Sequence, residues 1–218
     1  MKPIGKRSVQ LVCVLVVLLL AGVFVVRFIR GNNSPPIAPR GGESFQDFVN
    51  IETPFYLQRD PRWKDQAVGG SGESLGKVGC AVASLAMALH HYGVELTPAQ
   101  LNDSLKTHGG YTMRGWLKWG TVATISKGKV AVEIIPKPTH ADLDSALRQR
   151  RPVLVKVLIR HVIPHWVLII GKEGQEYLMR DPLGDSKSLT NLSSYGSDIY
   201  GVRVLKPGRP SIPLEAKP

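Results

Sequence analysis

Cysteine is scarce in this sequence of 218 residues, which has only Cys13 and Cys80. Two thiols cannot build a disulfide framework or a four-cysteine zinc site. Metal-ligand spacings of His, Cys, Asp and Glu are also missing, so we expect neither a metal nor another cofactor. The 22 glycines and 16 prolines follow no three-residue period, which excludes a collagen-like fibre.

Acidic residues are missing from the first 42 positions, although these carry six of the 28 Lys and Arg residues. The remainder holds 22 basic and 17 acidic residues, so more than half of the net charge of +11 lies at the N-terminal end. The basic cluster Arg148, Arg150 and Arg151 has no interleaved aromatic residues, and we therefore expect no nucleic-acid partner. A hydrophobic content of 43% argues against intrinsic disorder.

One long apolar run is present, the 18 residues from Val9 to Val26, whose only polar side chain is Gln10. As a helix it would extend about 27 Å, close to the ~30 Å hydrocarbon core of a membrane. The alternative is a cleaved signal peptide, but its apolar region is shorter, about 7–15 residues, and ends at a small-residue cleavage site. Here RFIRG follows the run, which favours an uncleaved signal anchor in the cell (inner) membrane.

The orientation of this anchor is not decided by charge, because three basic residues flank it on each side. A short N-terminal segment followed by a large C-terminal part favours a single-pass protein whose C-terminal part is exported. The organisation we expect is a basic segment (1–8), a transmembrane anchor (9–26), a Pro/Gly-rich linker (27–44), one globular domain (45–207) and a flexible tail (208–218).

The domain has readable secondary-structure patterns. Apolar spacing and capping signals predict helices, and short apolar runs predict strands. Because helices come first and strands later, we expect an α+β fold with an antiparallel sheet. The expected helices are 80–92, 97–106, 115–125 and 142–150, and the expected strands are 51–58, 152–159, 165–171, 176–181 and 200–205.

Cys80 is the candidate nucleophile, because it begins a predicted helix and follows a Gly-rich loop. The positive end of the helix dipole favours a thiolate there, and Gly79 lets a backbone or a substrate approach closely. The alternative is a small buried hydrophobic residue without chemistry.

His165 and Asp181 are predicted to lie side by side. A hairpin loop over 172–174, with Gly174 in the left-handed conformation, would pair residues whose numbers sum to 346. Residues 165 and 181 satisfy that register, and opposed Cβ atoms lie about 4.5–5.5 Å apart. A carboxylate beside an imidazole is the arrangement that orients a catalytic histidine. The alternative is a solvent-facing pair without a role.

Five segments occur in a characteristic order: YLQRDPRW (56–63), GKVGCAVASLAMALHHYG (76–93), RRPVLVKV (150–157), HWVLIIG (165–171) and RDPL (180–183). Together they resemble the papain-like cysteine peptidases, above all the bacteriocin-processing (double-glycine-leader) peptidases, over about residues 50–205. The resemblance implies a papain-like fold with helices packed on an antiparallel sheet. It implies Cys80 as nucleophile, His165 as general base and acid, Asp181 as the residue that orients His165, and Gln58 with the Cys80 backbone N–H as the oxyanion hole.

The resemblance also implies a bacterial thiol protease acting on a peptide or protein. Its relatives are usually fused to an ABC transporter, whereas we expect a stand-alone form here, so the leader-peptide substrate does not carry over. Two alternatives stay open: an acyl transferase or amidase with the same fold, and a non-catalytic peptide-binding module. His161 is an alternative base, while Asp60 and Trp63 are expected to fix a turn.

Overall fold

The computed structural model describes residues 35–185 and 188–208. From Pro36 onward, the described residues form one compact unit. The predicted anchor Val9–Val26 and almost all of the predicted tail lie outside the described residues. Within them, no helix combines the length and the apolar character needed to cross a membrane.

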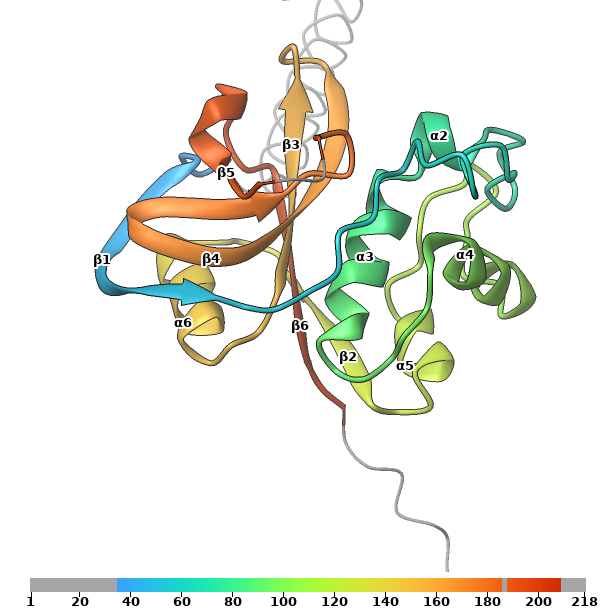
Figure 1. The fold of residues 1–218 in the computed structure, drawn as a ribbon, viewed down its shortest axis with the longest axis horizontal. Helices are drawn as coiled ribbons and strands as arrows, with labels where there is room; N and C mark the ends of the chain where they lie inside the picture. Colours follow the sequence, from blue (N-terminus) through green and yellow to red (C-terminus); the bar gives the residue numbers. More distant parts are fainter. Residues whose placement is uncertain (1–34, 186–187, 209–218) are drawn as a thin grey trace, which may run out of the picture. The chain divides into compact units, whose positions relative to one another are not determined.

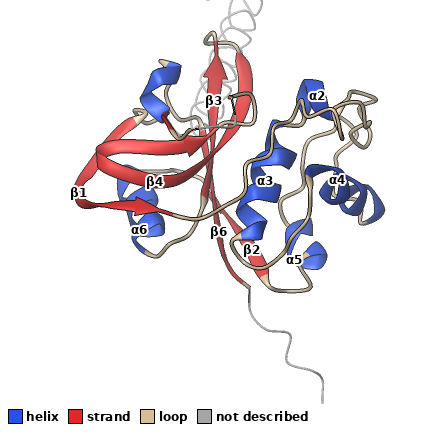
Figure 2. Ribbon diagram, viewed as in Figure 1, coloured by secondary structure: helices blue, strands red, loops and turns tan. Residues whose placement is uncertain are grey.

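An antiparallel sheet forms one half of this unit (Figures 1 and 2). Its strands lie in the order β1-β4-β3-β6-β2, and the short β5 pairs with β4. The predicted α+β class with an antiparallel sheet is therefore confirmed. The strands are β1 (Arg40–Asn50), β2 (Val130–Ile135), β3 (Val153–Ile159), β4 (Ile163–Arg180), β5 (Thr190–Asn191) and β6 (Gly201–Pro207).

Four helices gather beside one part of the sheet, and α6 lies apart from them against β1 (Figure 1). The gathered helices are α2 (Leu75–Val78), α3 (Cys80–His90), α4 (Pro98–Thr107) and α5 (Thr121–Ile125). The other helical segments are α6 (His140–Arg148) and the 3-10 helix η1 (Leu192–Tyr195). The predicted helix over 115–125 is thus shorter than expected, since only its last five residues are helical.

The helix α3 packs against the sheet and carries Cys80 at its first position. It is largely apolar on every side, and nine of the ten residues from Cys80 to Leu89 are buried, the exception being Ala81. This pattern is expected for a helix enclosed by the protein. Two polar contacts fix α3 and the turn after it on the sheet: the Ser84 Oγ donates to the Trp166 carbonyl at 3.1 Å, and the Tyr92 hydroxyl donates to the Leu205 carbonyl at 2.8 Å. The predicted helix over 80–92 is confirmed to within two residues.

Capping boxes define the starts of two helices. At α4, the Thr97 hydroxyl accepts from the Gln100 N–H and the Gln100 side chain accepts from the Thr97 N–H. Thr139 and Asp142 make the same reciprocal pair at α6, which begins two residues before the predicted helix over 142–150. Each cap satisfies backbone N–H groups that have no acceptor inside the helix.

β4 is continuous over a range that we predicted as two strands and a loop. It nevertheless folds back on itself, since a Cβ placed on Gly171 would lie 3.6 Å from the Cβ of Leu178; Figure 1 shows this reversal beside β1. Gly174 has a φ of +53°, which confirms the predicted left-handed residue. The residues around the reversal are strand rather than loop because β1 pairs with them, for example Phe45 with Gly174.

The N-terminal boundary of the domain was predicted too late. β1 begins at Arg40, inside the predicted linker 27–44, and Ile37 forms an isolated bridge with Ile199. β1 was not predicted because many of its residues are charged or small and only one of its side chains, that of Phe45, is buried in the core. The predicted strand over 51–58 is wrong, since residues 51–57 follow an irregular path, and β2 was missed.

Candidate active site

Cys80 lies at the start of α3 as a free thiol and is 9% exposed. The Gly79 N–H donates to the Leu75 carbonyl at 2.8 Å, and a Cβ on Gly79 would lie only 2.4 Å from that oxygen. Any larger residue at position 79 would therefore push α2 away from α3. The expected close backbone approach at Gly79 is present, and it comes from α2.

His165 lies near the start of β4, opposite Val157 of β3, and is 2% exposed. The next residue in the chain, Trp166, accepts the hydrogen bond from Ser84 of α3. Because Ser84 lies one helical turn after Cys80, this bond fixes the start of α3 relative to His165. The two side chains interact, and Cys80 contributes to the pKa of His165 by a hydrogen bond and by its charge.

Asp181 follows β4 directly and accepts from His165, with 2.7 Å between Nε2 of the ring and Oδ1 of the carboxylate. The same oxygen accepts from the Leu183 N–H at 2.8 Å, and Oδ2 accepts from the Tyr195 hydroxyl. The predicted contact between residues 165 and 181 is confirmed, since the fold-back of β4 brings its two ends together.

Gln58 lies beside this pair and is 3% exposed. Its backbone N–H donates to the carbonyl of Pro182, the residue after Asp181, at 3.0 Å. Its side-chain Nε2 donates to the carbonyl of Gly76 on α2, also at 3.0 Å. Gln58 therefore joins the segment that carries Asp181 to the helix immediately before Cys80. Four candidate residues from distant parts of the sequence meet at one place.

The pKa shifts favour a charged pair of His165 and Asp181 at neutral pH. Burial lowers the pKa of His165, but the hydrogen bonds and charges of Asp181 and Cys80 outweigh it and raise this pKa to about 9. Burial raises the pKa of Asp181, but the contacts from His165, Tyr195 and Leu183 outweigh it and leave this pKa below its ordinary value. An imidazolium held between a carboxylate and a thiol can stabilise a thiolate and later donate a proton.

A cavity of about 360 Å³ adjoins this cluster on the side of Asp181. Asp181 and Tyr195 form part of its wall, whereas Cys80 and His165 do not. The rest of the wall combines apolar side chains and hydroxyls, among them Phe55, Ile159, Met179, Thr190 and Ser194, with two charged residues, Arg160 and Asp185.

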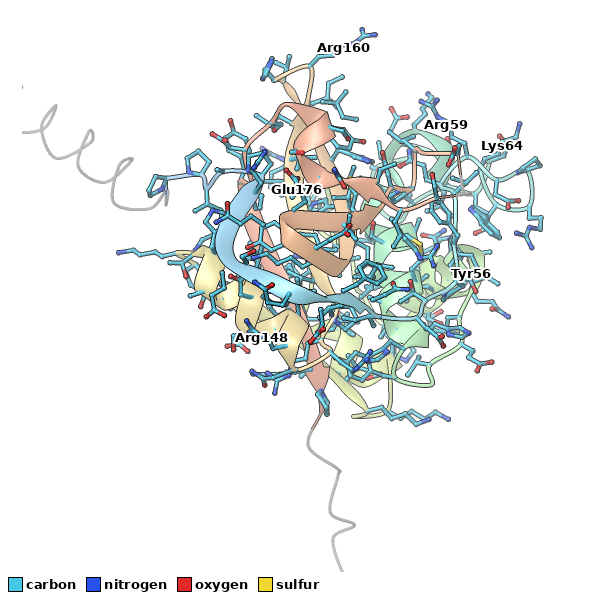
Figure 3. The ribbon with its side chains drawn as sticks, turned by 60° about the vertical axis from the view of Figure 1, so that its left-hand side comes forward. Tyr56, Arg59, Lys64, Arg148, Arg160 and Glu176 are labelled. Carbon is cyan, nitrogen blue, oxygen red and sulfur yellow. The ribbon has the colours of Figure 1, made fainter. Side chains whose placement is uncertain are left out.

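The alternative base, His161, is not brought into the cluster. It is exposed in the turn between β3 and β4 with a φ of +61°. The neighbouring Arg160 extends outward from the same turn (Figure 3). Neither side chain is among the groups that shift the pKa of His165 or Asp181.

The segment around Gln58 is shaped as expected. Asp60 accepts from the Arg62 N–H at 2.9 Å, and the Trp63 indole donates to the Leu57 carbonyl at 2.8 Å, so both residues fix the turn. Arg59 and Lys64, on either side, project outward (Figure 3).

Tyr195 is the polar side chain of the cluster that the sequence did not predict. No motif surrounds it, and it reaches Asp181 only because η1 folds beside β4.

Comparison with known proteins identifies the family of this chain. The sequence profile of the Peptidase C39 like family matches residues 51–195. The mesentericin transport/processing ATP-binding protein MesD of Leuconostoc mesenteroides is 34% identical over 108 residues, which are 47% of this chain and 13% of MesD. A crystal structure from Bacillus anthracis, of a C39-like peptidase, superimposes with a TM-score of 0.48 at 15% identity, covering 75% of this chain and all of that one. Because the profile covers most of the domain, the chain belongs to the Peptidase C39 like family of cysteine peptidases.

Proposed function

We propose that this protein cleaves a peptide or protein substrate with a triad of Cys80, His165 and Asp181. The observation that carries the proposal is the hydrogen bond of 2.7 Å between His165 and Asp181, made by a buried imidazole that also interacts with Cys80. Membership of a cysteine peptidase family supports it independently. This chain matches only 13% of the length of MesD, so the transport and processing for which MesD is named do not carry over to it.

The reaction begins with the Cys80 thiolate, which attacks the carbonyl carbon of the scissile bond. The Cys80 N–H, at the start of α3, and the Gln58 Nε2 donate to the oxygen that becomes negatively charged. His165 gives its proton to the nitrogen of the leaving amine as the bond breaks, and a thioester remains on Cys80. The neutral imidazole then takes a proton from water, whose oxygen attacks the thioester and releases the acid and Cys80.

The proposal is tested first on the thiol itself. In full-length protein carrying Cys13→Ala, Cys80 is the only thiol. We expect iodoacetamide to label it rapidly at pH 6, because the imidazolium of His165 stabilises the thiolate. Labelling that stays slow until about pH 8.5, where an ordinary thiol ionises, contradicts an activated nucleophile. The variant His165→Gln is the control and should show that late rise.

Turnover is tested with a peptide library digested by the full-length protein. Cys80→Ala and Cys80→Ser should both abolish cleavage while leaving the circular dichroism spectrum unchanged. An added amine nucleophile distinguishes hydrolysis from acyl transfer: only free-acid products are expected from a peptidase. Amide products would indicate an acyl transferase, and binding of peptides without any product would indicate a binding module.

The site of action is a second part of the proposal, and it is supported by the apolar run in the N-terminal part of the sequence. We propose that Val9–Val26 anchors the protein in the cell membrane of a bacterium, with the domain on the exported side. The full-length protein should remain with the membrane fraction after alkaline carbonate extraction, and protease added to spheroplasts should degrade the domain. Release by carbonate, or protection from the protease, would contradict the anchor or its orientation respectively.

A further inference from the structure

The Asp181 carboxylate is held from three sides. Its Oδ1 accepts from His165 and from the Leu183 N–H, while its Oδ2 accepts from the Tyr195 hydroxyl. The side chain of Asp181 is 13% exposed, so water contributes little to its solvation. A buried carboxylate stays ionised only when hydrogen-bond donors replace the lost water. Tyr195 is the only side chain besides His165 that supplies such a donor among the described residues.

Tyr195 is itself fixed in place. It ends η1, which follows β5 and packs on β3 and β4, and Gly196 terminates η1 in the left-handed conformation with φ +61°. Its ring lies 5.8 Å from the ring of His165, tilted by 38°. Burial and the negative charge of Asp181 raise the pKa of the Tyr195 hydroxyl, so this group keeps its proton and acts as a donor over the whole working pH range.

We propose that Tyr195 is a positioning residue of the active site, which holds the Asp181 carboxylate ionised and aimed at His165. The inference rests on the proposed peptidase function, because it assigns Tyr195 to the same triad. The position of the cavity explains why such a donor is required. Tyr195 and Asp181 both line the cavity, so without the hydroxyl the Oδ2 atom would face that space and the carboxylate could rotate away from the imidazole.

The charged and titratable groups around Asp181 determine the expected effect of removing the Tyr195 hydroxyl. His165 faces Asp181 from β4, and Cys80 faces His165 from α3. Arg160 and Asp185 line the cavity that Asp181 borders, and neither is a main cause of the lowered pKa of Asp181. Removing the Tyr195 hydroxyl deletes one of the contacts that lower the pKa of Asp181. The carboxyl should then take up its proton at a higher pH, and His165 would lose its partner there.

Tyr195→Phe tests the proposal, and Tyr177→Phe is its matched control. The hydroxyl of Tyr177, like that of Tyr195, donates to a carboxylate, here Asp144 at 3.0 Å, but this pair lies outside the triad. Tyr177 is fully buried, whereas Tyr195 is half-buried. We expect Tyr195→Phe to reduce kcat about ten-fold with an unchanged KM, because a positioning residue acts on the chemical step. The acid limb of the pH profile of kcat should move up by about one pH unit. Tyr177→Phe should change neither.

A second measurement does not depend on activity. The carboxyl carbon of Asp181, followed by 13C NMR, should titrate about one pH unit higher in Tyr195→Phe than in the parent protein. Incorporation of 3-fluorotyrosine at position 195 keeps the shape of the ring and makes its hydroxyl a stronger donor, so the titration should move lower. This variant serves if Tyr195→Phe does not fold.

An unchanged kcat and an unchanged Asp181 titration in Tyr195→Phe would overturn the inference. Equal effects of Tyr195→Phe and Tyr177→Phe would overturn it as well, since they would reflect a general loss of packing. If the parent protein cleaves nothing, the peptidase proposal fails, while a shifted Asp181 titration would still support the role of Tyr195 in holding the carboxylate.

Discussion

A buried ion pair between Lys172 of β4 and Asp144 of α6 offers the sharpest stability prediction. Both side chains are at most 3% exposed, and Nζ lies 2.5 Å from Oδ1. Each partner also bonds β1: Lys172 donates to the Gly41 carbonyl at 2.8 Å, and Asp144 accepts from the Glu43 N–H at 2.8 Å. The pair therefore fastens the first strand of the domain, which was missed in the sequence, to α6 and β4.

We predict that Asp144→Ala lowers the free energy of unfolding by about 3–5 kcal/mol, because it leaves the Lys172 ammonium buried without a counterion. That is a large share of the ~5–15 kcal/mol that stabilises an ordinary protein. The double variant Asp144→Leu/Lys172→Met removes both charges and should recover most of the loss, since apolar replacements of a buried pair are often neutral or stabilising.

Urea unfolding of the full-length protein, followed by circular dichroism, measures both effects. The matched control is the exposed pair Glu133–Lys206, whose atoms lie 2.9 Å apart with side chains 43% and 39% exposed. Glu133→Ala should cost no more than about 1 kcal/mol. The reasoning is refuted if Asp144→Ala costs as little as Glu133→Ala, or if the double variant is as unstable as Asp144→Ala.

Three further predictions concern the active site and α3. Gln58→Ala should lower kcat by about 10²–10³-fold, because one donor to the oxyanion is lost, while the rate at which iodoacetamide labels Cys80 stays unchanged. Steady-state kinetics and labelling measure the two quantities, and an unchanged kcat would exclude Gln58 from the oxyanion hole. Because the pKa of His165 is raised to about 9, its contribution to stability is complete below pH 6.5 and is lost as the pH rises through 9. The urea midpoint should therefore fall more between pH 7 and pH 10 in the parent protein than in His165→Gln, and equal falls would contradict the raised pKa. Leu85→Ala should cost about 2–5 kcal/mol in urea unfolding because Leu85 is fully buried in α3, and a loss below 1 kcal/mol would contradict its core position.

Helical periodicity and caps predicted most of the helical half of the domain. The capping box at Thr97 and the apolar run after Cys80 are local signals: Thr97 is the N-cap of α4, and Cys80 is the first residue of α3. The sheet was harder, because strand pairing joins distant segments. β1 has one core residue, Phe45, and its first residues, 40–44, were predicted as linker, while residues 172–174 were predicted as a loop. A glycine is required at position 171 by the Val49 carbonyl, which would lie 2.4 Å from a Cβ there.

The site residues also differ in whether a short segment of sequence is enough to predict them. Cys80 is predictable because a helix start beside a glycine has chemical meaning in one short segment. The contact between His165 and Asp181 is predictable because both residues lie at the ends of one reversing strand. Tyr195 belongs to neither class: its hydroxyl becomes informative only after β5 and η1 bring it to Asp181.

The charges of His165 and Asp181 require that α3 keeps a fixed position on the sheet. His165 can hold a proton at neutral pH only while Asp181 and Cys80 both stay within reach, because burial alone lowers its pKa. Asp181 directly follows β4 and Cys80 begins α3, so a small shift of the helix along the sheet would leave an uncompensated charge in the interior. The Ser84 hydrogen bond to the Trp166 carbonyl opposes that shift one turn from the thiol and one residue from the imidazole. A polar contact inside an otherwise apolar helix face is thus placed where the chemistry depends most on the position of α3.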